Sequence, residues 1–126
     1  MLNTGRILIA DGTEALLLPT ADLLRIEGYE CNYVPDAETV IEILKCVKFD
    51  LLIADIDIFV SRELETIKEL SDYTNELSII LVTDVLLSDE QIQSMKPAVA
   101  ACLSKPFCSE ELLKYVKCSI KNNVYN

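Results

Sequence analysis

Four side chains able to handle phosphate or a divalent cation each follow a short apolar run in this chain of 126 residues. Asp11 follows ILIA and Asp55 follows LLIA, while Thr83 follows IILV and Lys105 follows AACLS. Short apolar runs that alternate with helical stretches are typical of buried parallel strands, whose ligands gather outside the carboxyl ends. Two carboxylates, a hydroxyl and an ammonium are therefore expected to meet at one edge of a sheet. This set of groups predicts phosphoryl chemistry assisted by a divalent cation.

The elements that must position these residues alternate between strands and helices along the chain. Strands are expected at 6–11, 29–34, 49–54, 77–83 and 99–104, and helices at 13–28, 37–47, 61–73, 88–96 and 109–120. Pro19 predicts a kink in the first helix, or a start nearer Leu18, and Gly28 suits the end of that helix. Helix caps are expected at Asp36, Ser88 and Ser109. Such alternation requires right-handed crossovers and helices on both faces of a parallel sheet, which is a three-layer α/β domain.

The composition excludes several classes of function. With 21 acidic and 11 basic residues the chain carries a formal charge of -10, which disfavours direct binding to nucleic acid backbones or anionic membranes. The absence of histidine excludes Ser-His-Asp and Cys-His catalysis and the usual zinc sites. Five scattered cysteines predict reduced thiols in a cytoplasmic protein, most of them packed as small core residues. The amino-terminal residues lack a signal peptide, and no apolar run reaches the length of a membrane span.

The order of the motifs ILIAD, EGY, DLLIAD, LVTD and LSKPF resembles the receiver domain of two-component response regulators over essentially the whole chain. The most specific pieces are the step from Asp50 to Asp55 and the Lys105-Pro106-Phe107 element. The resemblance implies a single flavodoxin-like (βα)5 domain over residues 1–126, with a five-stranded parallel sheet of order 2-1-3-4-5. It also implies a signalling module and not an enzyme. Residues 121–126 are expected to be frayed or to begin a linker.

The resemblance assigns a role to each candidate residue. It implies that Asp55 accepts a phosphoryl group from a histidine kinase or a phosphotransfer protein, that Thr83 contacts the phosphoryl oxygen, and that Lys105 pairs with it. Mg²⁺ would be held by Asp11, Asp55 and the backbone carbonyl of Asp57. These roles agree with elementary chemistry, because a carboxylate that attacks an anionic phosphoryl donor needs a metal ion and a fixed ammonium to neutralise charge.

The implied output surface consists of the helix near 88–96, the fifth strand and the last helix. In the family this surface transmits the signal to an output domain or a downstream protein, and it also forms homodimers.

Three departures from the family pattern fall at functional positions. Gly12 stands where receivers commonly carry a second acid, which lowers the expected affinity for Mg²⁺. Asp84 follows the switch hydroxyl where a small residue is usual, and its charge would repel an incoming phosphate. Cys102 replaces the aromatic residue that turns inward in the family when the hydroxyl engages the phosphoryl group.

These departures leave two alternatives open. The first is a pseudo-receiver that keeps the fold and acts as a protein-interaction module without phosphorylation. The second, more remote, rests on the likeness of LLIADID to the hhhDxD start of haloacid-dehalogenase-like phosphatases, in which Asp55 would be the nucleophile and Asp57 a general acid. Phe59 stands where that motif has a small hydroxyl residue or valine.

Overall fold

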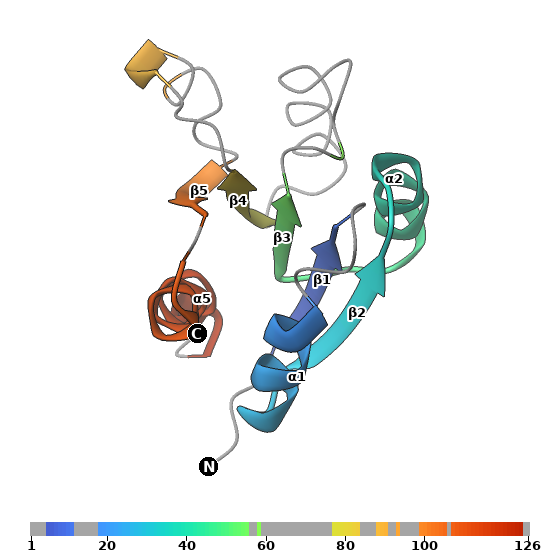
Figure 1. Ribbon diagram of the computed structural model, residues 1–126. Helices are drawn as coiled ribbons and strands as arrows, with labels where there is room; N and C mark the ends of the chain where they lie inside the picture. Colours follow the sequence, from blue (N-terminus) through green and yellow to red (C-terminus); the bar gives the residue numbers. More distant parts are fainter. Residues whose placement is uncertain are drawn as a thin grey trace.

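The fold is built around a parallel sheet that passes through the middle of the molecule. The computed structural model describes residues 5–11, 18–55, 58, 77–83, 88–90, 93, 99–105 and 107–124. All five strands run parallel in the order β2-β1-β3-β4-β5, as Figure 1 shows. Their bounds are β1 Arg6–Ala10, β2 Glu30–Val34, β3 Leu51–Asp55, β4 Ser78–Thr83 and β5 Val99–Ser104. The predicted sheet and its strand order are confirmed.

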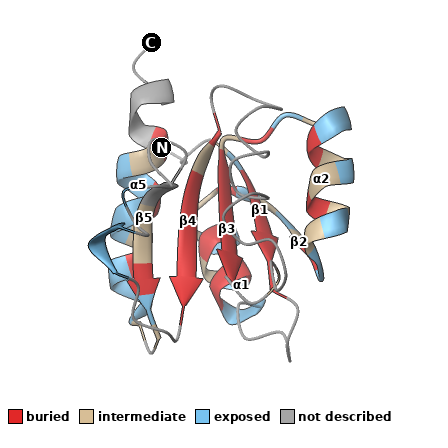
Figure 2. Ribbon diagram, turned by 90° about the horizontal axis from the view of Figure 1, so that it is seen from above, coloured by how far each residue is buried: buried red, intermediate tan, exposed pale blue. Residues whose placement is uncertain are grey.

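Helices cover both faces of this sheet and make three layers. Helices α1 (Leu18–Ile26) and α5 (Ser109–Val124) pack on one face, and α2 (Ala37–Cys46) packs on the other. Viewed from above, the buried strands lie between these two layers (Figure 2). The expected helix at 61–73 lies outside the described residues, and so does most of the segment expected as the helix at 88–96.

The apolar runs of the sequence are strands that are buried on both faces. Alternate residues of β1 and β3 point to opposite layers: Leu8 and Leu52 pack toward α2, whereas Ile7 and Ile53 pack toward α1 and α5. All four are fully buried. Strands that are covered on both sides need no polar alternation, which explains why these segments read as continuous apolar runs.

The ends of α1 and α2 have the chemistry that the sequence predicts. Gly28 has a positive φ of 105°, and the N–H of Gly28 and of Tyr29 donate to the carbonyls of Arg25 and Leu24, a pattern typical of a glycine-terminated helix. The Asp36 side chain accepts a hydrogen bond of 2.7 Å from the N–H of Thr39 and so caps α2. Pro19 is the second residue of α1 as described, and residues 12–17 lie outside the described part.

The start and the end of α5 differ from expectation. Ser109 is the first helical residue, and the capping position is Cys108, whose carbonyl accepts the N–H of Leu112 and whose Sγ lies 3.4 Å from the donating nitrogen of Glu111. The prediction of a Ser109 cap was therefore wrong: a sulfur atom, which is a weak acceptor, takes the place of a hydroxyl oxygen. The helix also continues to Val124 instead of ending near Ile120. Residues 125–126 lie outside the described part, and the expectation of a frayed tail or a linker stays a prediction.

All five cysteines are free thiols, but most are not core residues. Cys46, Cys108 and Cys118 are exposed, and Cys31 and Cys102 are half-buried. The expectation of core packing was wrong because the cysteines on α2 and α5 lie on the solvent side of these helices.

The half-buried Cys31 thiol is expected to react slowly. Burial raises the pKa of Cys31 from the ordinary value of 9.0 to about 11, and the nearby Arg25 guanidinium lowers it only in part. At pH 8 the thiolate fraction falls about a hundredfold, and the greater nucleophilicity of a more basic thiolate recovers part of this, so alkylation should be about tenfold slower than for an ordinary thiol. Peptide mapping after timed iodoacetamide treatment at pH 8 and pH 10 measures this. A Cys31 rate equal to that of Cys46 at pH 8 would contradict it.

Candidate functional site

The strand register gathers the predicted site residues at the carboxyl edge of the sheet. Ala10 of β1 pairs with Ala54 of β3, so the next residues, Asp11 and Asp55, end neighbouring strands. Asp55 itself pairs with Val82 of β4, which precedes Thr83. Because parallel strands end at the same side of a sheet, residues far apart in the sequence meet at this edge.

Asp55 and Lys105 form a buried ion pair at the centre of this edge. The Nζ atom of Lys105 is in hydrogen-bonding contact with Oδ2 of Asp55. The side chain of Asp55 is 1% exposed and that of Lys105 is 18% exposed. An ammonium held against a buried carboxylate stabilises its charged form, which is the nucleophilic form of the group.

Thr83 is fixed beside this pair through its backbone. The carbonyl of Thr83 accepts a hydrogen bond of 2.8 Å from the backbone N–H of Lys105, and Thr83 pairs with Ser104 in the ladder between β4 and β5. Thr83 is 3% exposed. The structure thus places Thr83 between the two neighbouring strand ends that carry Asp55 and Lys105.

Asp11 lies at the same acidic edge of the sheet and has a donor that the sequence did not point to. The hydroxyl of Tyr33, from β2, donates to the backbone carbonyl of Asp11 at 3.2 Å. Burial, which is the largest cause, together with the negative charges of Asp11 and Asp55 raises the pKa of Tyr33 to about 12. Tyr33 is thus a neutral donor close to both carboxylates. Its only sequence signal is its place next to the end of the strand beside β1.

The two acids fit a magnesium ion in number and chemistry. Asp11 is 2% exposed and Asp55 is 1% exposed, and they end adjacent strands. Mg²⁺ is bound in proteins by one or two carboxylates with several waters, so this donor set suits it. Among the described residues no group of three or more acidic, cysteine or histidine side chains is arranged to hold a metal. The predicted third ligand, the carbonyl of Asp57, lies outside the described residues.

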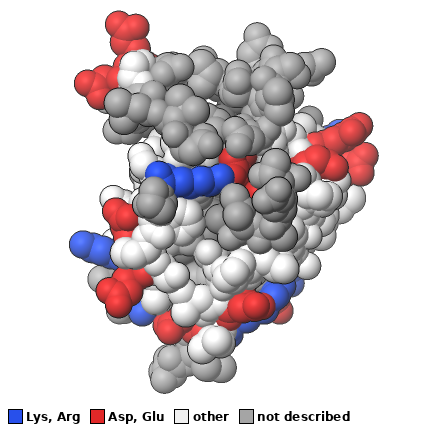
Figure 3. Space-filling view, in the orientation of Figure 1, with Lys and Arg blue, Asp and Glu red and all other residues white. Residues whose placement is uncertain are grey.

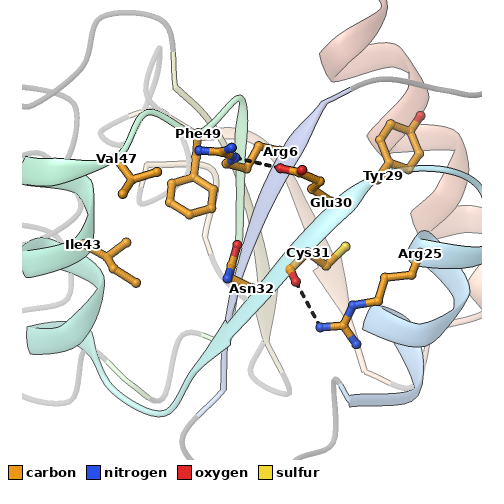
Figure 4. Close-up of a pocket in the computed structure, with 9 residues that line it drawn as sticks. All are labelled: Arg6, Arg25, Tyr29, Glu30, Cys31, Asn32, Ile43, Val47 and Phe49. Carbon is orange, nitrogen blue, oxygen red and sulfur yellow. Dashed lines mark hydrogen bonds and ion pairs between the residues drawn. The ribbon is translucent and has the colours of Figure 1, made fainter.

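A separate groove of about 630 Å³ lies beside β2, and neither Asp11 nor Asp55 lines it (Figure 4). Its two arginines already have partners within the chain: Arg6 forms an ion pair of 2.9 Å with Glu30, and Arg25 donates to the carbonyl of Cys31 at 3.0 Å. β2 is an edge strand, and Arg25 occupies an acceptor on its open side. The two arginines therefore help to cover the open edge of the sheet, and we do not assign phosphate binding to this groove.

The surface agrees with the charge balance of the sequence. On the face shown in Figure 3, acidic side chains are spread around the described part of the molecule. The basic side chains that this face shows form no continuous patch. Within the described ranges, no helix combines the length and the apolar character needed to cross a membrane.

Comparisons with known proteins place these observations in a family. Residues 7–117, which include Asp11, Asp55, Thr83 and Lys105, match the response regulator receiver domain. A curated relative, the transcriptional regulatory protein RprY of Bacteroides fragilis, is 26% identical over 107 residues. This match covers 85% of the present chain and 45% of the relative, so the chain spans about half the length of that protein.

Solved structures show the same architecture. A CheY-like receiver domain from Methanospirillum hungatei is 26% identical, with a TM-score of 0.84 and coverage of 95% of this chain and 96% of that one. The response regulator TrrA of Thermotoga maritima, in complex with Mg²⁺ and BeF, is also 26% identical, with a TM-score of 0.76 and coverage of 90% and 97%.

Receiver domains are signalling modules rather than conventional enzymes, and their partners are histidine kinases. The family match spans nearly the whole chain and contains Asp11 and the ion pair between Asp55 and Lys105. The chain therefore belongs to the response regulator receiver domain family.

Proposed function

We propose that this chain is a working receiver in which Asp55 accepts a phosphoryl group from a histidine kinase or a phosphotransfer protein. The observation that carries this proposal is the contact between the ammonium of Lys105 and the buried carboxylate of Asp55. An Asp–Lys pair at the carboxyl edge of a parallel sheet provides a nucleophile and a fixed positive charge for the phosphoryl oxygens. The family match over residues 7–117 also favours a receiver over the haloacid-dehalogenase-like alternative.

The proposed transfer needs little covalent chemistry from the protein. A carboxylate oxygen of Asp55 attacks phosphorus, the bond from phosphorus to the kinase histidine nitrogen breaks, and the imidazole leaves with the electron pair. Lys105 then pairs with a phosphoryl oxygen, and the hydroxyl of Thr83 hydrogen-bonds another. When bound by Asp11, Asp55 and the carbonyl of Asp57, Mg²⁺ supplies neutralisation of the phosphoryl charge.

Phosphorylation would be read at the surface formed by the expected helix at 88–96, β5 and α5. Receivers respond to a ligand by shifting a balance between existing conformations. In this chain Cys102, which is half-buried in β5 and packs toward the α2 layer, takes the place of the family's mobile aromatic residue. The end of β4 at Thr83 would therefore carry more of the change. An output domain or a downstream protein would receive the signal. The same surface could also form a homodimer through α5 and β5.

The pseudo-receiver is the second candidate, and two observations favour it. The chain has Gly12 instead of a second acid after Asp11, and it lacks the aromatic switch at Cys102. In that case the same surface would bind a partner whether or not Asp55 is modified. We place the protein in the cytoplasm, where histidine kinases deliver phosphoryl groups, and expect no direct contact with nucleic acid or membrane by this chain, given its charge of -10.

Intact-mass spectrometry after incubation with acetyl phosphate and Mg²⁺ tests the proposed function. The parent protein should gain one phosphoryl group, and Asp55→Asn should gain none. Asp50→Asn is the matched control, because Asp50 lies at the opposite end of the same strand, where its Oδ2 accepts the N–H of Arg6 at 2.8 Å. Asp50→Asn should gain mass like the parent. An unmodified parent would support the pseudo-receiver instead.

A further inference from the structure

Tyr33 lies on the strand next to β1 and donates to the backbone carbonyl of Asp11. It is the next-to-last residue of β2 and pairs with Ile9 of β1, two residues before Asp11. From there its ring reaches across the end of β1, and its hydroxyl lies 3.2 Å from the Asp11 carbonyl. The ring itself packs with the core cluster on the side of α1 and α5. Its position is therefore set by packing, and the hydroxyl is brought to Asp11 by the sheet.

Different donors contact the two strand ends that carry the acids. The ammonium of Lys105 contacts the carboxylate of Asp55, whereas the hydroxyl of Tyr33 donates to the backbone carbonyl of Asp11. A tyrosine hydroxyl is a neutral donor at pH 7. Tyr33 thus holds Asp11 without adding a charge of its own to an already acidic site.

A donor of this kind matters most where the metal ligands are few. Carboxylates that bind metals are usually held in turn by hydrogen bonds, and removing such a partner commonly costs tenfold or more in metal affinity. Here Gly12 follows Asp11, so the chain has fewer acids near the end of β1 than receivers commonly provide. The orientation of Asp11 is then a larger part of what defines the cation site.

We propose that Tyr33 is a positioning residue for the divalent cation: its hydroxyl holds the backbone carbonyl of Asp11 and thereby fixes the place from which the Asp11 carboxylate would bind Mg²⁺. The proposal rests on the proposed function only in assigning Mg²⁺ to Asp11 and Asp55. The sequence motifs identify only acidic residues for the cation site, whereas this proposal adds a tyrosine from the edge strand β2.

Mg²⁺ titration of Tyr33→Phe, followed by the amide chemical shifts of Ala54, Asp55 and Thr83, tests this proposal without phosphorylation. The expected dissociation constant for Mg²⁺ is about tenfold higher than in the parent. Tyr29→Phe is the matched control, because Tyr29 is a buried tyrosine at the opposite end of β2. Its dissociation constant should stay within about twofold of the parent, as for a change remote from the site.

Each outcome decides the proposal. An unchanged Mg²⁺ affinity in Tyr33→Phe overturns the proposal. An equal loss of Mg²⁺ affinity in Tyr29→Phe also overturns it, because the loss would then follow from removing any tyrosine hydroxyl in or next to β2. Amide shifts of α5 in the cation-free state report whether Tyr33→Phe remains folded like the parent. A parent that shows no saturable Mg²⁺ binding also overturns the proposal. Phosphorylation is read separately by mass, so a failure of the proposed function remains distinguishable from a failure of this inference.

Discussion

Replacement of Lys105 by methionine is expected to lower the free energy of unfolding by about 2–4 kcal/mol at neutral pH and to abolish phosphorylation of Asp55. The reason is the burial of the pair: the side chain of Asp55 is 1% exposed and that of Lys105 is 18% exposed. Without Lys105, the Asp55 carboxylate would remain buried close to Asp11 with its main compensating charge removed. Removing one partner of a buried ion pair costs several kcal/mol, and the partial exposure of the lysine moderates the loss.

Urea denaturation of the parent and of Lys105→Met measures this effect, with Lys117→Met as the matched control. Lys117 also forms an ion pair, at 3.6 Å with Glu27, but its side chain is 50% exposed. Loss of such an exposed pair should cost about 0–1 kcal/mol. The double variant Lys105→Met with Asp55→Asn should recover much of the lost stability, because it removes the stranded charge. Equal destabilisation by the two lysine substitutions would contradict the buried-pair argument.

Replacement of Asp11 by asparagine is expected to raise the stability of the cation-free protein and to lower its affinity for Mg²⁺. Asp11 and Asp55 are buried at the ends of adjacent strands, so their negative charges repel. Asparagine keeps the shape of the side chain and leaves the backbone carbonyl that accepts from Tyr33 unchanged, but it removes one charge. We expect the cation-free protein to gain about 1 kcal/mol of stability, in line with the general trade-off between stability and function at active sites. We expect its Mg²⁺ affinity to fall at least about a hundredfold, because a neutral amide replaces one of two carboxylate ligands.

Thermal unfolding with EDTA and with Mg²⁺ measures both parts of this prediction. A ligand that binds only the folded state raises the melting temperature, so the parent should melt higher in Mg²⁺. Asp11→Asn should melt higher than the parent in EDTA and should show no rise with Mg²⁺. Asp50→Asn, at the other end of β3, should keep the Mg²⁺-dependent rise. A preserved Mg²⁺ response in Asp11→Asn would remove Asp11 from the cation site.

The sequence predicts the sheet well because its signals are local. Strands β3 and β4 are buried on both faces, so each appears as an uninterrupted apolar run ending in Asp55 or Thr83. The cap at Asp36 and the terminating glycine at Gly28 depend only on neighbouring residues and were also predictable. The strand order did not follow from alternation alone and came from the family resemblance.

The features that were missed depend on contacts between distant segments or on weak chemistry. Tyr33 reads as an ordinary strand residue, and only the pairing of β2 with β1 brings its hydroxyl to Asp11. Cys108 was passed over as a cap because Ser109 is the better acceptor by type, whereas the backbone begins the helix one residue earlier than that choice requires. The extent of α5 beyond Ile120 was underestimated because residues 121–126 are polar and lack an apolar pattern.

The double attachment of Lys105 has a mechanical consequence. Its backbone N–H is bonded to the carbonyl of Thr83 on β4, while its ammonium contacts Asp55 on β3. A single residue therefore ties three neighbouring strand ends, since Lys105 itself follows β5. Any gain of negative charge at Asp55 pulls on an ammonium whose own main chain is anchored to the adjoining strand. Displacement of that one side chain would therefore act on the backbone at the ends of β4 and β5.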